Sequence, residues 1–208
     1  MNITTYGNIS IYNTEQGSED WHRLRSTKMT ASAAYCVKVG GKGLETYIAS
    51  LAANIYAKEG NDKESISTAD MQRGQRLEDG AVAAYELETG LKVDRVGFVT
   101  NLAYENAGCS PDGLVGDEGS IEVKSPANDT FAKLLYTQEV DSKYLWQMQM
   151  QMLICDRKWC DFVAFNPNFK KDIFIKRIER DPVMQTKLIN GIAKGNEMLK
   201  KYEQIFNS

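Results

Sequence analysis

The sequence predicts an α/β fold in which helices flank a central mixed β-sheet. Helices are expected in LETYIASLAANIYA, where apolar residues recur at helical spacing, and in the C-terminal segment DPVMQTKLINGIAKGNEMLKKYEQIF. Between them, VDRVGFVT, SIEVKSP, WCDFVAFNP and DIFIKRIER alternate with a period of two, which is typical of strands. No repeat, low-complexity stretch or Pro/Gly/Ser-rich linker divides the chain, so we expect a single domain over residues 1–208.

The N-terminal part is expected to begin with the strand ISIY. Ser18 then provides a typical N-cap for the short helix EDWHRLR. A second helix is expected to start near Thr30 or Ser32, and the third, LETYIASLAANIYA, should end near Gly60.

The middle of the chain begins with a long predicted helix, DMQRGQRLEDGAVAAYELETG, which Gly90 stops. The strand VDRVGFVT follows, and GLVG and SIEVKSP form a hairpin across the turn Gly-Asp-Glu-Gly. A further helix is predicted near TFAKLLYT. In YLWQMQMQMLICD glutamine and methionine alternate as in a strand, but the Leu, Met and Gln content favours a helix, which is our interpretation.

Composition excludes several kinds of chemistry. The four cysteines form no CxxC pair, and the single histidine, His22, leaves too few ligands for a zinc site. We expect reduced thiols packed as small apolar residues. A Ser-His-Asp or Cys-His mechanism would require His22 itself as the base, so catalysis should depend on carboxylates and lysine.

Charge and targeting signals bear on partners and location. The net charge of −3 lacks the basic footprint of many nucleic-acid-binding domains, although local basic clusters such as Lys170 and Lys171 leave open a charged groove or a solvated face of mixed charge. The N-terminus lacks the apolar stretch of a secretory signal, and no run of about 18 apolar residues exists. We expect a cytoplasmic protein without a membrane segment.

The stretch SPDGLVGDEGSIEVKSP carries the strongest chemical signal. Residues i and i+2 of a strand share a face, so Glu122 and Lys124 should project together, and the hairpin can bring Asp112 beside them. Two carboxylates suit a hard cation such as Mg²⁺, and the lysine could orient or deprotonate a water or stabilise a phosphate. The alternative is an Asx-turn at Asp112 and a simple Glu122–Lys124 pair.

Several blocks in order resemble the phage lambda exonuclease family, viral-recombinase nucleases of the PD-(D/E)xK group: WHRLR, TASAAY, RGQRLEDGAVAAYELETG, CSPDGL, IEVKSP and YLWQMQ. The resemblance implies a restriction-endonuclease-like core, two Mg²⁺ or Mn²⁺ ions and 5′-to-3′ digestion of one strand of duplex DNA from a 5′-phosphorylated end. It also implies 3′ single-stranded tails for recombination by single-strand annealing, a phage annealing protein as partner, a phage or prophage origin in a bacterial host, and a homotrimeric ring that threads DNA.

The resemblance assigns the catalytic residues to Asp112, Glu122, Lys124 and Glu78, and the metal ligands to Asp112, Glu122 and the carbonyl of Val123. Read from the residues alone, the glutamate of RGQRLEDG would be an exposed helix charge paired with one of the two arginines in that block.

The resemblance also implies contacts to the 5′-terminal phosphate by Arg25, Ser32, Ser110 and Gln149, with Gln147 or Gln151 as alternatives to Gln149. A guanidinium fork and a helix start near Ser32 suit phosphate oxygens.

Other residues have less specific expectations. Trp21 and Trp146 are expected in the core, with stacking on bases as the alternative, and the methionines of QMQMQM in core or subunit packing. A strand-separating element is expected between about residues 57 and 71, and its role stays open. Two rival functions remain: a PD-(D/E)xK endonuclease, and a catalytically inactive DNA-end binding module.

Overall fold

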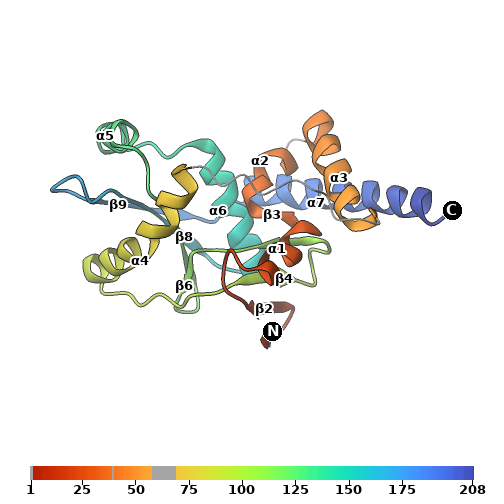
Figure 1. Ribbon diagram of the computed structural model, residues 1–208, viewed down its shortest axis with the longest axis horizontal. Coiled ribbons are helices and arrows are strands. Elements are labelled where there is room, and N and C mark those ends of the chain that lie inside the picture. The colour runs from red at the N-terminus through yellow and green to blue at the C-terminus, as the bar shows by residue number, and fades with distance from the viewer. Residues whose placement is uncertain (1, 39, 58–68) are drawn as a thin grey trace.

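The computed structural model describes residues 2–38, 40–57 and 69–208, and within 69–76 only the backbone. In these segments the strands form two mixed sheets with helices around them (Figure 1). The α/β class with mixed sheets and flanking helices is therefore confirmed. The pattern of alternation had suggested one central sheet, whereas the strands divide into a sheet of five and a sheet of four.

The first sheet has the order β1-β2-β4-β5-β3. Its strands are β1 (Asn2–Tyr6), β2 (Ile9–Asn13), β4 (Phe98–Asn101), β5 (Ala107–Cys109) and β3 (Met29–Thr30). Only the pairing of β3 with β5 is parallel among the described strands of this sheet. This pairing brings the segment before Ser32 next to the segment before Ser110.

The second sheet has the order β6-β7-β8-β9. Its strands are β6 (Gly113–Val115), β7 (Gly119–Lys124), β8 (Trp159–Phe165) and β9 (Ile173–Glu179). The pair β6–β7 is the predicted hairpin, and the two predicted strands β8 and β9 pair with each other in antiparallel orientation. Strand β7 pairs with β8 in parallel. An isolated bridge between Asp94 and Leu114 ties the chain before β4 to β6.

Helices are arranged around both sheets (Figure 1). They are α1 (Glu19–Ser26), a 3₁₀ turn η1 (Ala31–Ala33), α2 (Ala34–Val37), α3 (Gly41–Tyr56), α4 (Ala69–Thr89), α5 (Asn128–Thr137), α6 (Ser142–Cys155) and α7 (Pro182–Phe206). The helix α7 extends beside α3 to the C-terminal end of the molecule, while α4 lies against the second sheet. None of the helices that the structure describes is long and apolar enough to span a bilayer.

Most predicted elements are present with changed boundaries. The Ser18 hydroxyl caps α1 by accepting from the backbone N–H of Trp21, and Gly90, with φ 71°, ends α4. The expected strand VDRVGFVT is a strand only from Phe98 onward. The expected third helix is described up to Tyr56, and its predicted end near Gly60 lies outside the described residues.

The helix α6 is buried on several sides, which explains its ambiguous sequence. Trp146 and Met150 pack into the core cluster beneath the first sheet, whereas Met148 and Met152 pack with β8 and α5. The core reading of Trp146 and the methionines is thus confirmed. A helix with apolar contacts on opposite sides shows no single apolar stripe, so its residues do not follow the amphipathic period.

The cysteines also match the expected reduced state. All four are free, and Cys109, Cys155 and Cys160 are buried. Burial raises the pKa of the Cys160 thiol well above its ordinary value, so this residue behaves as a small apolar side chain.

Candidate active site

The β6–β7 hairpin brings Asp112 beside the end of β7. Asp112 directly precedes β6, whose register places Gly113 opposite Ile121. The Asp112 Oδ2 accepts a hydrogen bond of 2.6 Å from the backbone N–H of Val123. This bond fixes the carboxylate next to the Val123 peptide, between the two side chains that β7 directs to the same face, Glu122 and Lys124.

Glu122 is 1% exposed, and three side chains donate hydrogen bonds to its carboxylate. Lys124 Nζ and Gln147 Nε2 donate to Oε1, the latter at 2.5 Å, and Gln151 Nε2 donates to Oε2 at 2.5 Å. Gln147 and Gln151 are four residues apart on α6, so they share a helix face. A buried carboxylate needs such partners, because leaving one unpaired costs about 3–5 kcal/mol.

The charges in this cluster perturb one another. Burial, and next the charge of Glu122, raise the pKa of the Asp112 carboxyl well above its ordinary value. Burial alone would lower the pKa of Lys124, but the charges of Glu122 and Asp112 outweigh it and raise the pKa, so the side chain is an ammonium ion at neutral pH. Two close carboxylates with a single lysine form an electrostatically unfavourable arrangement that a divalent cation would relieve.

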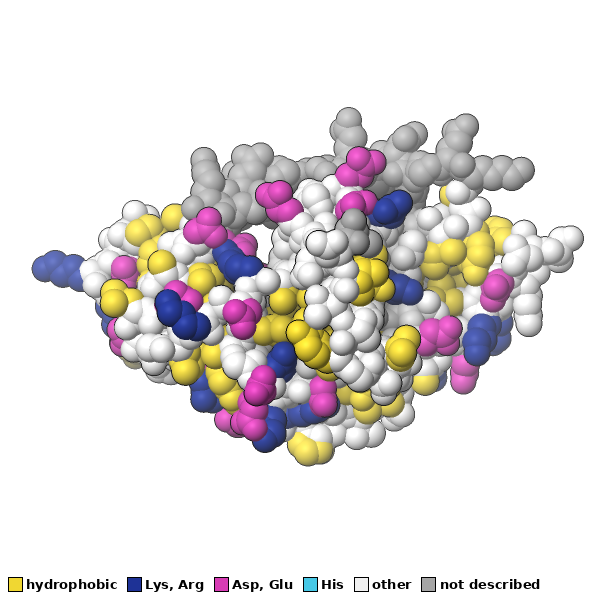
Figure 2. All heavy atoms as spheres, turned by 90° about the horizontal axis from the view of Figure 1, so that it is seen from below, with side chains coloured by type: hydrophobic (Ala, Val, Ile, Leu, Met, Phe, Trp, Pro, Cys, Tyr) yellow, Lys and Arg dark blue, Asp and Glu magenta, His cyan; other side chains and the backbone are white. Residues whose placement is uncertain are grey.

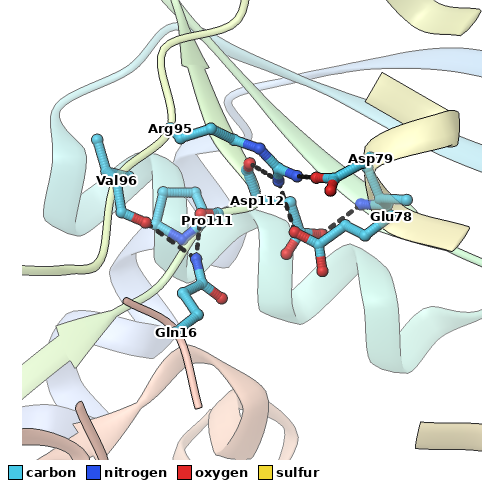
Figure 3. Close-up of polar contacts among 8 residues, drawn as sticks. Gln16, Glu78, Asp79, Arg95, Val96, Pro111 and Asp112 are labelled. Carbon is cyan, nitrogen blue, oxygen red and sulfur yellow. Dashed lines mark hydrogen bonds and ion pairs between the residues drawn. The ribbon is translucent and has the colours of Figure 1, made fainter. Parts of the chain in front are cut away.

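Glu78 reaches the same cluster from α4. Its Oε1 accepts from Arg95 Nη1 at 2.5 Å, and the same nitrogen donates to the backbone carbonyl of Asp112 at 2.9 Å (Figure 3). The charge of Glu78 contributes to the raised pKa of Asp112. The partner seen for Glu78 is thus Arg95, while the side chains of the arginines considered from the sequence, Arg73 and Arg76, lie outside the described residues.

Three of the residues expected at a 5′-phosphate, Arg25, Ser32 and Ser110, are linked through Arg25 and Trp21 of α1. Arg25 Nη2 donates to Ser32 Oγ at 3.1 Å, and the guanidinium carbon lies 4.2 Å from the centroid of the Trp21 ring. The Trp21 Nε1–H donates to Ser110 Oγ at 2.8 Å. The indole therefore connects the arginine to the Ser-Pro-Asp turn. Trp21 is only partly buried and belongs to none of the core clusters of the described residues, so the core position expected for it is wrong.

Arg25 is also electrostatically linked to the carboxylates. Burial lowers the pKa of Arg25, and the charges of Tyr47, Cys109 and Glu122 oppose this effect. A partly buried guanidinium with a serine hydroxyl on one side and an indole on the other is suited to an anionic ligand.

Gln149 is not brought to the carboxylates or to Arg25. Its Nε2 donates to the carbonyl of Glu179 at 2.8 Å, and its Oε1 accepts from the backbone N–H of Asp181 and from Gln185 Nε2, both at 3.0 Å. The residues two positions before and after it, Gln147 and Gln151, are the glutamines that donate to Glu122. A helix turns about 100° per residue, so residues two apart point to nearly opposite sides.

Two cavities border the cluster. One, of about 880 Å³, is lined by Trp21, Glu78 and Arg95 among others, and the other, of about 730 Å³, opens at Lys124 and is bordered by Lys143 and Tyr144. Acidic and basic side chains are interspersed on the face shown in Figure 2, without a continuous basic surface there. The first cavity thus borders the cluster at Glu78 and the second at Lys124.

The fit of the cluster to a metal depends on oxygen ligands. In the part of the chain that the structure describes, no group of three or more His, Cys, Asp or Glu side chains is arranged to hold a metal ion. Asp112, Glu122 and the Val123 carbonyl are nevertheless the kinds of oxygen donor that hard cations prefer. Burial, and next the charge of Glu122, raise the pKa of Asp112, and a cation beside the carboxylate would oppose this shift. These residues fit a divalent cation such as Mg²⁺.

Sequence reasoning missed Arg95 and left the choice among the glutamines open. The pair Gln147 and Gln151 had a signal, the four-residue spacing on a predicted helix that also carries apolar residues. No sequence signal pointed to Arg95, because the segment VDRVGFVT that contains it was interpreted only as a strand, whereas the strand begins at Phe98. The predicted strand-separating element falls mainly on residues 58–68, which are outside the described part of the chain.

Comparison with known proteins shows similarity over most of the chain. Residues 20–158 match the family described as the YqaJ-like viral recombinase domain. No curated protein sequence matches significantly.

Among solved structures, the alkaline exonuclease LHK-Exo from Laribacter hongkongensis is 33% identical, with a TM-score of 0.82 over 90% of this chain and 96% of that one. The same enzyme in complex with dAMP is 34% identical, with a TM-score of 0.81 and the same coverage. A phage related exonuclease from Haemophilus somnus 129PT, 16% identical with a TM-score of 0.59 over 86% of this chain and 95% of that one, shares the fold. The architecture is the restriction-endonuclease-like fold.

Proposed function

The chain belongs to the YqaJ-like viral recombinase family, and on this premise we propose that it is a metal-dependent exonuclease that digests one strand of linear duplex DNA from 5′ to 3′. The similarity to an alkaline exonuclease over 90% of the chain supports a nuclease. The observation that carries the proposal is the cluster in which Asp112 bonds to the Val123 N–H while Lys124 donates to Glu122.

Each residue of the cluster has a role that its contacts support. Asp112, Glu122, the Val123 carbonyl and Glu78 would hold the divalent cations, which when bound supply an activated water and screen phosphate charge. Lys124, as an ammonium ion, stabilises negative charge on the scissile phosphate. Gln147 and Gln151 hold the Glu122 carboxylate in place.

The proposed polarity depends on the group around Arg25. Its guanidinium binds the 5′-terminal phosphate, with Ser32 and Ser110 as hydroxyl partners. The same terminal phosphate would end up on a released 5′-mononucleotide, and the complex of LHK-Exo with dAMP is a complex with such a nucleotide. Gln149, expected from sequence at this phosphate, is placed elsewhere in this conformation, so its contact stays a prediction.

The wider setting is proposed from the family. A nuclease of this kind leaves 3′ single-stranded tails, which a phage annealing protein would bind for recombination in the cytoplasm of a bacterial host. A homotrimeric ring around the DNA would let an acidic chain with a charge of −3 keep its basic residues on an inner surface.

The test of the activity compares linear 5′-phosphorylated duplex with closed circular DNA, each with Mg²⁺ and with EDTA. Loss of the linear DNA only with Mg²⁺, with the circle intact, is expected. Asp112→Asn and Lys124→Ala should abolish digestion. Wild-type rates in either variant would contradict the mechanism, cutting of the circle would favour an endonuclease, and end binding without hydrolysis would favour an inactive binding module.

A further inference from the structure

Arg95 lies between α4 and β4 and makes three side-chain contacts at the edge of the carboxylate cluster (Figure 3). Nη1 donates to Glu78 Oε1 at 2.5 Å and to the Asp112 carbonyl at 2.9 Å, and Nη2 donates to Asp79 Oδ1 at 2.6 Å. One guanidinium group therefore joins two residues of the site that come from different elements, the helix α4 and the turn before β6.

The backbone beside Arg95 is fixed to the same hairpin. The backbone N–H of Asp94 donates to the carbonyl of Leu114 at 2.8 Å, and the N–H of Leu114 donates back to Asp94 at 2.9 Å. This bridge lies one residue before Arg95 and two residues after Asp112. The arginine is thus anchored at its backbone as well as at its side chain.

A second cross-link comes from Gln16. Its Nε2 donates to the carbonyl of Val96 at 3.0 Å and to the carbonyl of Pro111 at 3.1 Å (Figure 3). These carbonyls belong to the residues next to Arg95 and Asp112. The backbone segments that carry Arg95 and Asp112 are therefore held side by side by contacts before and after Arg95.

The two acids bound by Arg95 differ in their surroundings. The side chain of Glu78 is 29% exposed, whereas that of Asp79 is 95% exposed. Partial burial alone would lower the pKa of Arg95, but hydrogen bonds and charge from Glu78 and then Asp79 outweigh it and raise the pKa. The enclosed contact is the one to Glu78, while an exposed pair such as that with Asp79 contributes little.

We propose that Arg95 is a positioning residue of the reaction: it holds the Glu78 carboxylate beside Asp112, in the orientation that a metal-binding cluster requires, and acts through Glu78. This inference rests on the proposed function, in which Glu78 and Asp112 belong to the catalytic cluster. Groups that orient metal ligands are commonly worth about 10–100-fold in metal affinity or activity.

The test uses Arg95→Lys and Arg95→Gln. Lysine keeps the charge but lacks the fork that reaches two acceptors, and glutamine removes the charge. Both variants should lower kcat about tenfold or more, with KM for DNA ends within about twofold, and lysine should retain more activity than glutamine. Asp79→Asn, which removes the exposed partner of the same guanidinium, is the matched control and should have nearly wild-type kcat.

Coupling distinguishes positioning from a general structural effect. In a Glu78→Gln background, Arg95→Gln should cause no further loss of kcat, because a residue that acts through Glu78 has nothing left to position. Mn²⁺ binding to the DNA-free protein, measured by electron paramagnetic resonance, provides a readout besides activity. Arg95→Lys should weaken it about tenfold, and this difference should vanish in the Glu78→Gln background.

The outcomes separate this inference from the proposed function. Unchanged kcat and Mn²⁺ binding in both Arg95 variants, with kcat of Glu78→Gln strongly reduced but still measurable, would overturn the role of Arg95 and leave the nuclease mechanism intact. Equal additive losses in both backgrounds would also overturn it. Full activity in Glu78→Gln would remove Glu78 from the mechanism and overturn the inference with it.

Discussion

At the scale of single residues, the contacts of Arg25 determine what its loss should do. Arg25→Ala should lower the preference for a 5′-phosphorylated over a 5′-hydroxyl end about tenfold or more, because a charge-assisted hydrogen bond contributes about 1.5–3 kcal/mol. Digestion of 5′-phosphorylated and 5′-hydroxyl duplexes, compared at limiting DNA concentration, measures this preference.

Arg23→Ala is the matched control, since Arg23 lies on the same helix with a side chain that is 74% exposed and paired to Asp20. It should retain the preference. If Arg25→Ala retained it as well, the terminal phosphate would have to bind elsewhere.

The residues that carry chemistry were predicted to different degrees. The proximity of Asp112, Glu122 and Lys124 could be predicted from the two-residue period of a strand and one hairpin turn. The donors to Glu122 could not be fixed in advance, because which glutamine of QMQMQM faces β7 depends on how α6 packs between two clusters. The position of Arg95 at the site depends on a bridge between residues 94 and 114. Such a long-range contact leaves no local pattern in the sequence from which it could be predicted.

At the scale of elements, the packing of α7 against α2 supports the region of Ser32. A Cβ at Gly191 on α7 would overlap the backbone carbonyl of Val37, and a backbone atom cannot move aside cheaply. Gly191→Ala should therefore lower the free energy of unfolding by about 1–3 kcal/mol, as measured by denaturant unfolding.

Gly43→Ala provides the control within another helix, α3. A Cβ there would have no atom within 4 Å, so the change should leave stability unaltered or raise it by up to about 1 kcal/mol through helix propensity. Equal destabilisation by both substitutions would contradict the packing argument, because the two changes are chemically identical.

Element boundaries were harder to predict than element types. The long helices, the β6–β7 hairpin and the strands β8 and β9 were expected from periodicity, and the hairpin also from its turn residues. The division into two sheets was not, because β3, β4 and β5 are two to four residues long and pair across distant parts of the chain. Strands this short carry too few residues for alternation to be recognised.

At the scale of the whole molecule, cation binding should stabilise the fold. Burial and the charge of Glu122 raise the pKa of Asp112, and a divalent cation would relieve this repulsion in the folded state only. A cation at 100 times its Kd would add about 2.7 kcal/mol, so the melting temperature of the DNA-free protein should rise with Mn²⁺ or Mg²⁺.

Asp112→Asn should abolish most of that rise, because the amide removes a charged ligand. An equal rise in wild type and variant would place the stabilising cation at another site.

The central claim is digestion from a 5′-phosphorylated end, and its most direct measurement follows each end of a linear duplex with a strand-specific label. With Mg²⁺ present, the account predicts early loss of a 5′-end label as mononucleotide, while a 3′-end label on the same strand persists in progressively shorter fragments. Early release of the 3′-end label, or internal cuts with both ends retained, would contradict it.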